Sequence, residues 1–274
     1  MGLRFNAAVI GVLIASSPAA FADEAPNLLT DSFSLALGTF VVGTDTKVQL
    51  DGKTGEGDQV NWENTFGGGD VTRFRMDGSW RFADRHQLRF LWFTAGRSGQ
   101  KTLQEDIEWG GEIFPVTAKV KGEFNFDIYE LAYEYAFLRR DSYEVTGTIG
   151  LHYTDLALAL SAKASASGGT LEGNIRKEGS VGAPLPVVGV RGLWSLPHNL
   201  WLNATAQYFT LSIDEYDGSL QDYKLMLTWQ PKKWLGLGIG YNRFAVDVDV
   251  DSSNFAGSLD WTYDGPMIQY SAAF

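Results

Sequence analysis

The strongest constraint on the fold is an alternation of apolar and polar residues that recurs along most of the 274-residue chain. In residues 72–82 the even positions include Phe74 and Trp80, while the odd positions are mostly charged. Residues 129–137 and 268–274 follow the same period of two. This period gives a β-strand one apolar and one polar face, and repeated segments of about ten such residues are typical of transmembrane β-strands. A soluble β-sandwich also alternates, but it does not need large aromatic residues at its strand ends.

Four short polar turns separate the alternating segments, and each has aromatic residues on both sides. These turns are residues 84–86, 139–142, 197–199 and 231–233. Aromatic residues beside tight turns are typical of the girdle at a membrane–water interface. Longer stretches rich in Gly, Asp and Ser lie at residues 51–70, 96–111, 163–184, 214–220 and 249–255. Short turns at one end and long loops at the other predict periplasmic turns and extracellular loops.

The pattern predicts an all-β fold, a single closed antiparallel transmembrane β-barrel of about ten strands. We expect the strands at residues 32–48, 71–82, 87–98, 122–138, 143–160, 185–195, 199–212, 220–230, 234–247 and 256–274. Eight strands would result if two ladders are misread, and twelve if the second or third long hairpin contains another pair. Ten strands need roughly 100 residues to cross the membrane, so we expect the remaining residues of the barrel domain in strand extensions and outer loops.

Residues 1–22 have the features of a secretory signal peptide. They carry a positive charge at Arg4, an apolar stretch too short to span a bilayer, and an A-x-A cleavage pattern that ends at Ala22. A buried N-terminal helix is the alternative interpretation. Cleavage after Ala22 would leave residues 23–274 as a single barrel domain.

The composition excludes several other classes of protein. Aromatic residues make up 14% of the chain, far more than a disordered chain carries, and the absence of Cys excludes disulfides and thiolate metal sites. The net charge of −11 argues against a nucleic-acid binder, and no apolar run of 18 residues supports a membrane-spanning helix. The mean hydropathy of −0.12 fits strands with one apolar and one polar face.

With its signal peptide, its aromatic-flanked turns and a last strand that ends in Phe274, the chain resembles the small outer-membrane β-barrel proteins of Gram-negative bacteria. The resemblance covers essentially all of residues 23–274 and implies an outer-membrane location. It implies that Tyr270 and Phe274 belong to a signal read by the barrel-assembly machinery. The implied partners are this machinery, outer-membrane lipid and lipopolysaccharide. The resemblance implies nothing about a specific activity.

If the apolar strand faces meet lipid, the opposite faces line the lumen. The expected lumen residues, six basic and five acidic, are Arg73, Arg75, Asp77, Arg81, Arg89, Glu130, Glu134, Glu144, Arg191, Asp222 and Lys224. This near balance predicts mutual ion pairing rather than a pore selective for one charge. Arg81 and Arg89 flank the first turn and are expected nearly opposite each other, with Glu134 and Glu144 at similar depth beside the second turn. These four predict an ion-pair cluster near the periplasmic end, either a static plug or, alternatively, a gated constriction.

One candidate for catalysis is His152, which the alternation of its strand places on the lumen face. Barrel enzymes such as omptin-type proteases need a His within hydrogen-bond reach of a Ser or an Asp. Asp155 lies three residues further along the strand and therefore has the opposite parity. We interpret His152 as a hydrogen-bonding lumen residue and assign no catalytic residue.

Asp247, Asp249 and Asp251 alternate on one face of the ninth expected strand and its extension. Converging carboxylates of this kind could hold Ca²⁺ or Mg²⁺ through oxygen ligands, but the spacing lacks the Gly and the terminal Glu of an EF-hand loop. We interpret these residues as a solvated acidic surface and assign neither a metal nor another cofactor.

The expected function is therefore non-enzymatic: a structural or surface-exposed barrel whose lumen is plugged by ion pairs. One alternative is a small passive channel for small or hydrophobic solutes. The other is an enzyme that acts on lipid or peptide at the barrel rim.

Overall fold

The fold comes from a computed structural model, which describes residues 26–40, 43–51, 57–66, 70–104, 106–115, 118–162, 175–213, 216–251 and 256–274. The predicted signal peptide, residues 1–22, lies outside the described residues. The elements are β1 Phe33–Phe40, β2 Gly43–Leu50, β3 Val60–Asn61, α1 Trp62–Phe66, β4 Asp70–Ala83, β5 His86–Thr102, β6 Ile107–Trp109, β7 Glu112–Phe114, β8 Lys119–Arg139, β9 Tyr143–Ala162, β10 Ile175–Leu196, β11 Leu200–Ile213, β12 Tyr216–Lys232, β13 Leu235–Asp251 and β14 Ala256–Ala273. Among the described residues, no helix is long and apolar enough to cross a bilayer.

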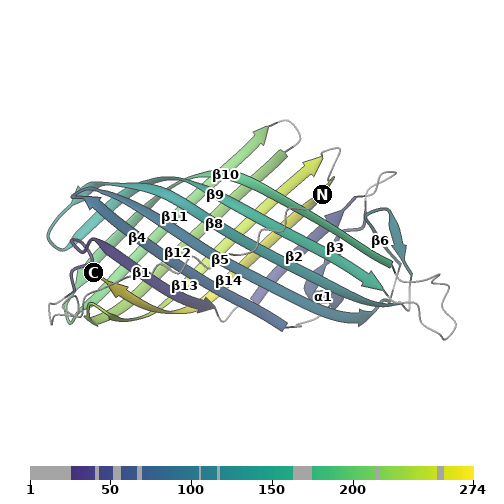
Figure 1. Cartoon of the computed structure of the whole chain (residues 1–274), viewed down its shortest axis with the longest axis horizontal. Coiled ribbons are helices and arrows are strands. Elements are labelled where there is room, and N and C mark those ends of the chain that lie inside the picture. The colour runs from purple at the N-terminus through teal and green to yellow at the C-terminus, as the bar shows by residue number, and fades with distance from the viewer. Residues whose placement is uncertain are drawn as a thin grey trace.

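The strands form one closed antiparallel barrel (Figure 1). Each long strand pairs with the next along the chain, and β1 closes the barrel by pairing with both β4 and β14. β1 and β2 lie one after the other along β14, since Phe40 pairs with Met267 and Gly43 with Asp264. They therefore share one place in the wall, which gives ten places, and the predicted ten-stranded barrel is confirmed.

The two ends of the barrel differ as the sequence predicts. We call the end with the four short turns the turn end, and the opposite end the loop end. β8 has 21 residues and β10 has 22, about twice the nine to eleven that a barrel strand needs to cross a bilayer. The wall therefore consists of a half near the turn end and a long extension toward the loop end (Figure 1).

The half near the turn end, which we call the belt half, has an apolar exterior. On β8 it covers residues 129–137 and on β9 residues 145–153. Large apolar residues point outward all around this half, and each is more than a third exposed. They include Phe82, Leu131, Tyr135, Ile149, Val190, Leu225, Trp229, Ile239 and Ile268. A continuous exposed apolar band on a closed barrel is the surface that meets the hydrocarbon of a membrane. Inward positions of the same strands are polar, including Glu130, Glu134 and Thr148.

Beyond this belt the polarity is inverted. We call this part the loop half; on β8 it covers residues 120–128 and on β9 residues 154–162. Its inward side chains form an aromatic core, in which Phe126 and Trp261 have ring centroids 4.3 Å apart and Phe93 stacks on Tyr263 at 5.2 Å. Each of these four side chains is at most 2% exposed. The loop half is thus built like a soluble β-domain, with an apolar interior.

The wall of the loop half divides into two sheets. The β10–β11 ladder stops at Val188 and Tyr208, although β10 continues to pair with β9 back to Ile175. Pro184 and Pro186 lie just beyond that point. Pro184 and Pro186 are two residues apart, so both lack the backbone N–H on the same edge of β10. The loss of two successive donors on the edge that faces β11 accounts for the end of the β10–β11 ladder. On the opposite side of the barrel, β4 pairs with β1 only as far as Arg75 and Gly38, and β2 pairs instead with β14 and β3.

The opening between β2 and β4 is bridged by the short helix α1. Glu63 in its first turn accepts hydrogen bonds from the Thr46 backbone N and Oγ1 on β2, both at 2.9 Å. The same carboxylate pairs with Arg97 on β5. Trp62 and Phe66 on this helix are buried in the aromatic core. α1 therefore joins the two sheets where no ladder connects them.

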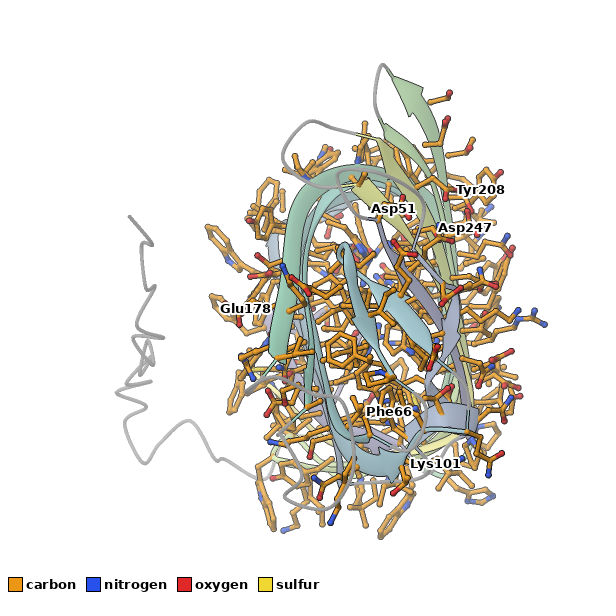
Figure 2. The ribbon with its side chains drawn as sticks, turned by 90° about the vertical axis from the view of Figure 1, so that its right-hand side faces the viewer. Asp51, Phe66, Lys101, Glu178, Tyr208 and Asp247 are labelled. Atoms are coloured by element: carbon orange, nitrogen blue, oxygen red, sulfur yellow. The ribbon has the colours of Figure 1, made fainter. Side chains whose placement is uncertain are left out.

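The hairpin β6–β7 lies between the two sheets at the loop end (Figure 2). Trp109 and Phe114 are 0% exposed and extend the aromatic core. Gly110 has a φ of 59°, which the tight turn requires, and its N donates to Leu50 O at 2.9 Å. Figure 2 shows Glu178 on one wall and Asp247 on the other, with the hairpin between them.

An N-terminal segment, residues 26–32, packs against the turn end. Leu29 is 2% exposed and packs with Leu193 and Trp201 inside the wall. Arg139 Nη2 donates to Leu29 O at 2.7 Å, and Lys233 Nζ forms an ion pair with Asp31 at 3.1 Å. The segment therefore covers the turn end of the lumen.

Several expected boundaries are wrong in the loop half. The expected loop at residues 163–184 contains the first ten residues of β10, and the loop at 96–111 contains the end of β5 and all of β6. The loop at 51–70 contains β3 and α1, while β12 and β13 extend into the loops at 214–220 and 249–255. Pairing with neighbouring strands extends these segments despite their Gly, Ser and Asp content.

The lumen as the candidate functional site

Glu134 on β8 is the centre of a buried ion-pair network in the belt half. Its Oε1 accepts from Arg89 Nε and its Oε2 from Arg191 Nε, each at 2.9 Å. Gln87 Nε2 donates to Oε2 at 2.7 Å, and Thr148 Oγ1 donates to Oε1 at 3.3 Å. The side chain is 0% exposed. Four donors, two of them charged, thus compensate for the burial of this carboxylate.

Arg191 on β10 links Glu134 to Glu144 on β9. Its Nη2 donates to Glu144 Oε1 at 3.1 Å, and Arg81 Nη2 from β4 donates to the same oxygen at 2.8 Å. The structure therefore brings together the four residues expected to cluster, and Arg191 joins them.

Arg81 and Arg89 were expected nearly opposite each other, and the register gives their positions. Arg81 pairs in register with Gln87, and Arg89 pairs with Ser79. The two arginines are therefore diagonal neighbours on one face of the sheet, beyond a register shift between Arg81 and Ala83. Their guanidinium groups bind different carboxylates, and no anion is needed between them.

Glu130 extends the network toward the middle of the barrel. It accepts hydrogen bonds from Arg89 Nη2 and His152 Nε2, and from Gln207 Nε2 at 2.9 Å. His152 is 0% exposed. Within the described residues, His152 Nδ1 and Gln207 Oε1 have no hydrogen-bond partner. Buried polar atoms of this kind are the usual positions of internal water.

A second network joins β4 to β12 and β13 across the lumen. Arg75 Nε pairs with Asp77 at 2.8 Å, and Lys224 Nζ pairs with the same carboxylate at 2.9 Å. Arg75 Nη1 also reaches Asp222, at 3.4 Å, and Asn242 Oδ1, at 3.2 Å. Tyr263 is part of the aromatic core, and its hydroxyl donates to Asn242 Oδ1 at 3.0 Å. This network therefore connects the ionic layer to the aromatic core.

Ten of the eleven expected lumen charges belong to these two networks. The eleventh, Arg73, lies higher, near Arg97 and Glu63 in the loop half. The lumen is thus filled by two kinds of layer, ion pairs inside the belt and aromatic rings above it.

A cavity of about 130 Å³, lined by both polar and apolar side chains, lies between the ion-pair network and the N-terminal segment. Arg81, Arg191 and Lys224 line it from the wall, and Leu28 and Asp31 line it from the N-terminal segment. A space of this size beside charged groups has room for several water molecules.

The surroundings of His152 do not form a catalytic constellation. Its Nε2 binds the carboxylate of Glu130, deep in the lumen, while the exposed Asp155 pairs in register with Asp127 on the outside. A general base must reach a substrate proton, and a fully buried imidazole within an ionic network does not.

The acidic residues of β13 lie on the outer face of the loop half. Asp247 pairs in register with Asp260, and Asp249 with Asp217. Partial burial, followed by repulsion from Asp249 and Asp260, raises the pKa of Asp247. The side chain of Asp251 lies outside the described part of the structure. Among the residues described, no group of three or more His, Asp or Glu side chains is arranged to hold a metal ion.

The expected assembly signal lies in the strand that closes the barrel. Phe274 N donates to Phe33 O at 2.8 Å, and Phe33 N donates to Phe274 O at 3.0 Å. The hydroxyl of Tyr270 donates to Trp234 O at the turn end. Both residues are therefore accessible to another protein only from the turn end or the lipid side.

Sequence reasoning missed the neutral members of the site. Gln87, Gln207, Asn242 and Thr148 all have inward parity and are at most 6% exposed. The same parity rule that identified the charged residues would have found them, because polar residues facing the lumen of the belt half are buried whether or not they carry charge.

No protein-family model matches the sequence, and no curated protein is detectably similar to it. Solved structures are similar to this chain at low sequence identity. The outer membrane protease OmpT from Escherichia coli is 12% identical, with 92% of this chain and 100% of that one covered at a TM-score of 0.54. A FadL homologue from Pseudomonas aeruginosa is 8% identical, with 96% and 95% covered at a TM-score of 0.39. The likeness to OmpT shows a shared barrel fold and, at 12% identity, assigns no activity.

Proposed function

Because the chain has the fold of the outer-membrane β-barrels of Gram-negative bacteria, we propose that it is a closed, non-enzymatic barrel that anchors a rigid scaffold at the cell surface. The apolar belt spans the membrane, the turn end faces the periplasm, and the loop half rises outside.

The observation that carries the proposal is the filled lumen. Within the belt, Glu134 and its partners occupy the interior, and above it Phe126, Trp261 and their neighbours pack ring against ring. A ten-stranded barrel has little space beyond its own side chains. Buried ion pairs are costly to separate, so such a plug is static.

The scaffold role follows from the apolar core of the loop half. An apolar core is not needed to hold a barrel in lipid, but it is needed to keep a wall rigid in water. Glu178 and Asp247 lie on opposite outer walls of this half (Figure 2), and the strands beneath them position the surface loops.

An enzymatic role is disfavoured by the placement of His152. Its ring nitrogen is bound to Glu130 in the interior, whereas the barrel rim is where a substrate could arrive. If the protein hydrolysed lipid or peptide at the rim through His152, His152→Ala would change the lipid A or peptide profile of cells. We expect no such change.

A small passive channel is the second candidate, and the cavity between the N-terminal segment and the ion-pair network favours it. In that case residues 26–31 would act as the gate at the periplasmic end.

Conductance in planar bilayers separates the two functions. We expect no discrete steps from the purified protein, and none after deletion of residues 26–31, because the ionic and aromatic layers remain. Steady conductance steps from the intact protein, or steps that emerge on deletion, would establish the channel and overturn the proposal that the lumen is blocked. A heat-modifiable band shift on gels verifies that both proteins are folded.

A further inference from the structure

A groove of about 330 Å³ opens at the turn end, outside the lumen. It lies between the β4–β5 turn, the β8–β9 turn and the N-terminal segment. Arg85, Arg139 and Arg140 line it together with Asp84 and Asp141. Three guanidinium groups against two carboxylates give the groove a positive balance in a chain whose net charge is −11.

Each of the three guanidinium groups donates to a backbone carbonyl oxygen. Arg85 Nη1 donates to Ala136 O at 3.1 Å, and Arg140 Nη1 donates to Arg139 O at 3.2 Å. Arg139 Nη2 donates to Leu29 O at 2.7 Å, and its Nη1 pairs with Asp84 at 3.5 Å. A guanidinium has five N–H donors, so Arg85 and Arg140, each bound to one carbonyl oxygen, keep donors for a ligand.

The groove borders the aromatic girdle of the belt. His86 follows Arg85, and its ring lies 6.0 Å from that of Phe82 and 5.2 Å from that of Tyr135. Its Nδ1 is hydrogen-bonded to the Tyr133 hydroxyl at 2.6 Å. These rings are on the lipid-facing side, where acyl chains meet headgroups. A ligand that uses both features has an anionic head and an apolar body.

We propose that this groove binds the phosphate of an anionic phospholipid in the periplasmic leaflet. The planar forks of Arg85 and Arg140 match the oxygens of a phosphate, and the girdle rings contact the acyl chains. A soluble phosphate would use the arginines alone, so the neighbouring girdle favours a lipid. The site is independent of the lumen and of whether the barrel conducts.

The test compares lipid binding to the wild type, Arg140→Gln and Lys232→Gln. Lys232 lies next to the β12–β13 turn, so Lys232→Gln removes the same charge away from the groove. Arg139 is left unchanged because it anchors the N-terminal segment. Detergent-solubilised protein is titrated with phosphatidylglycerol and with zwitterionic phosphatidylcholine, and bound lipid is counted by native mass spectrometry. The band shift on gels verifies folding.

We expect the wild type and Lys232→Gln to prefer phosphatidylglycerol, and Arg140→Gln to lose about tenfold in affinity for it, as the loss of a charge-assisted hydrogen bond implies. No preference in the wild type, or equal loss in Lys232→Gln, would overturn the site. Glycerol phosphate and inorganic phosphate are added as competitors. Displacement of lipid at equal concentration would assign the groove to soluble phosphate and overturn the lipid proposal.

Discussion

The substitution Glu134→Gln tests the ion-pair network at its centre. It keeps the size of the side chain and removes one charge. Glu134 accepts from Arg89 Nε and Arg191 Nε, each at 2.9 Å, so the change leaves two buried guanidinium groups with less negative charge between them. The new amide group also places N–H donors opposite at least one existing donor.

The expected loss follows from the remaining partners. Removing one member of a buried ion pair costs about 3–5 kcal/mol. Arg89 keeps Glu130, and Arg191 keeps Glu144 at 3.1 Å, so we expect the lower end, about 3 kcal/mol. The matched control is Glu123→Gln on the outer face of β8, where Glu123 pairs with the exposed Arg176. An exposed pair contributes about 0.2–1 kcal/mol.

The assay is urea-induced unfolding in phospholipid vesicles, followed by Trp fluorescence and by the heat-modifiable band. Glu134→Gln is expected to lower the free energy of unfolding well below that of Glu123→Gln. If the two variants unfold at the same urea concentration with the same slope, the network does not stabilise the barrel and the reasoning is refuted.

Three further predictions concern the loop half. Trp261→Ala should lower the unfolding free energy by about 3–5 kcal/mol, measured in the same titration, because the ring fills the centre of the aromatic core. Glu63→Gln should detach α1 from β2, seen as faster hydrogen exchange of the Thr46 amide, with exchange in the belt unchanged. Partial burial and Asp249 raise the pKa of Asp247, so its charged form disfavours the folded state and stability rises as pH falls through that pKa. Asp247→Asn should therefore raise the melting temperature slightly at pH 7 in low salt, and should lose this advantage at low pH or in high salt.

The sequence was sufficient to predict the belt half, because there each strand alternates between lipid and lumen. The turn at residues 197–199 falls where expected, the turn expected at 84–86 differs by one residue, and strand β9 begins at the expected residue, Tyr143. Polar turns with aromatic flanks fix these boundaries through local chemistry.

The loop half could not be predicted to the same extent. Residues 175–184 carry Gly179, Ser180 and Gly182, which have no strand preference, yet they pair with β9 throughout. This pairing comes from the neighbouring strand rather than from local sequence. Alternation also does not show which face is inside, so the inversion of polarity along one strand is visible only in the fold.

The alternation of residues along each strand identified the members of the ion-pair cluster, but not which of them form hydrogen bonds with one another. Arg191 joins Glu134 and Glu144 from a strand distant in sequence from Arg81. The bulge between Arg81 and Ala83 decides that Gln87 lies opposite Arg81. Register and bulges depend on turn geometry, and residue type alone does not specify them.

The filled lumen is tested most directly by thiol labelling, since the chain has 0 Cys and any single Cys reports without background. Ala132 is 1% exposed between Glu130 and Glu134, whereas Ile113 on β7 is 60% exposed at the loop end. In vesicles, a charged, membrane-impermeant thiol reagent should modify Ile113→Cys rapidly and Ala132→Cys only after unfolding. Labelling of folded Ala132→Cys at a rate close to that of Ile113→Cys would show a water-filled lumen and contradict the claim that side chains fill it.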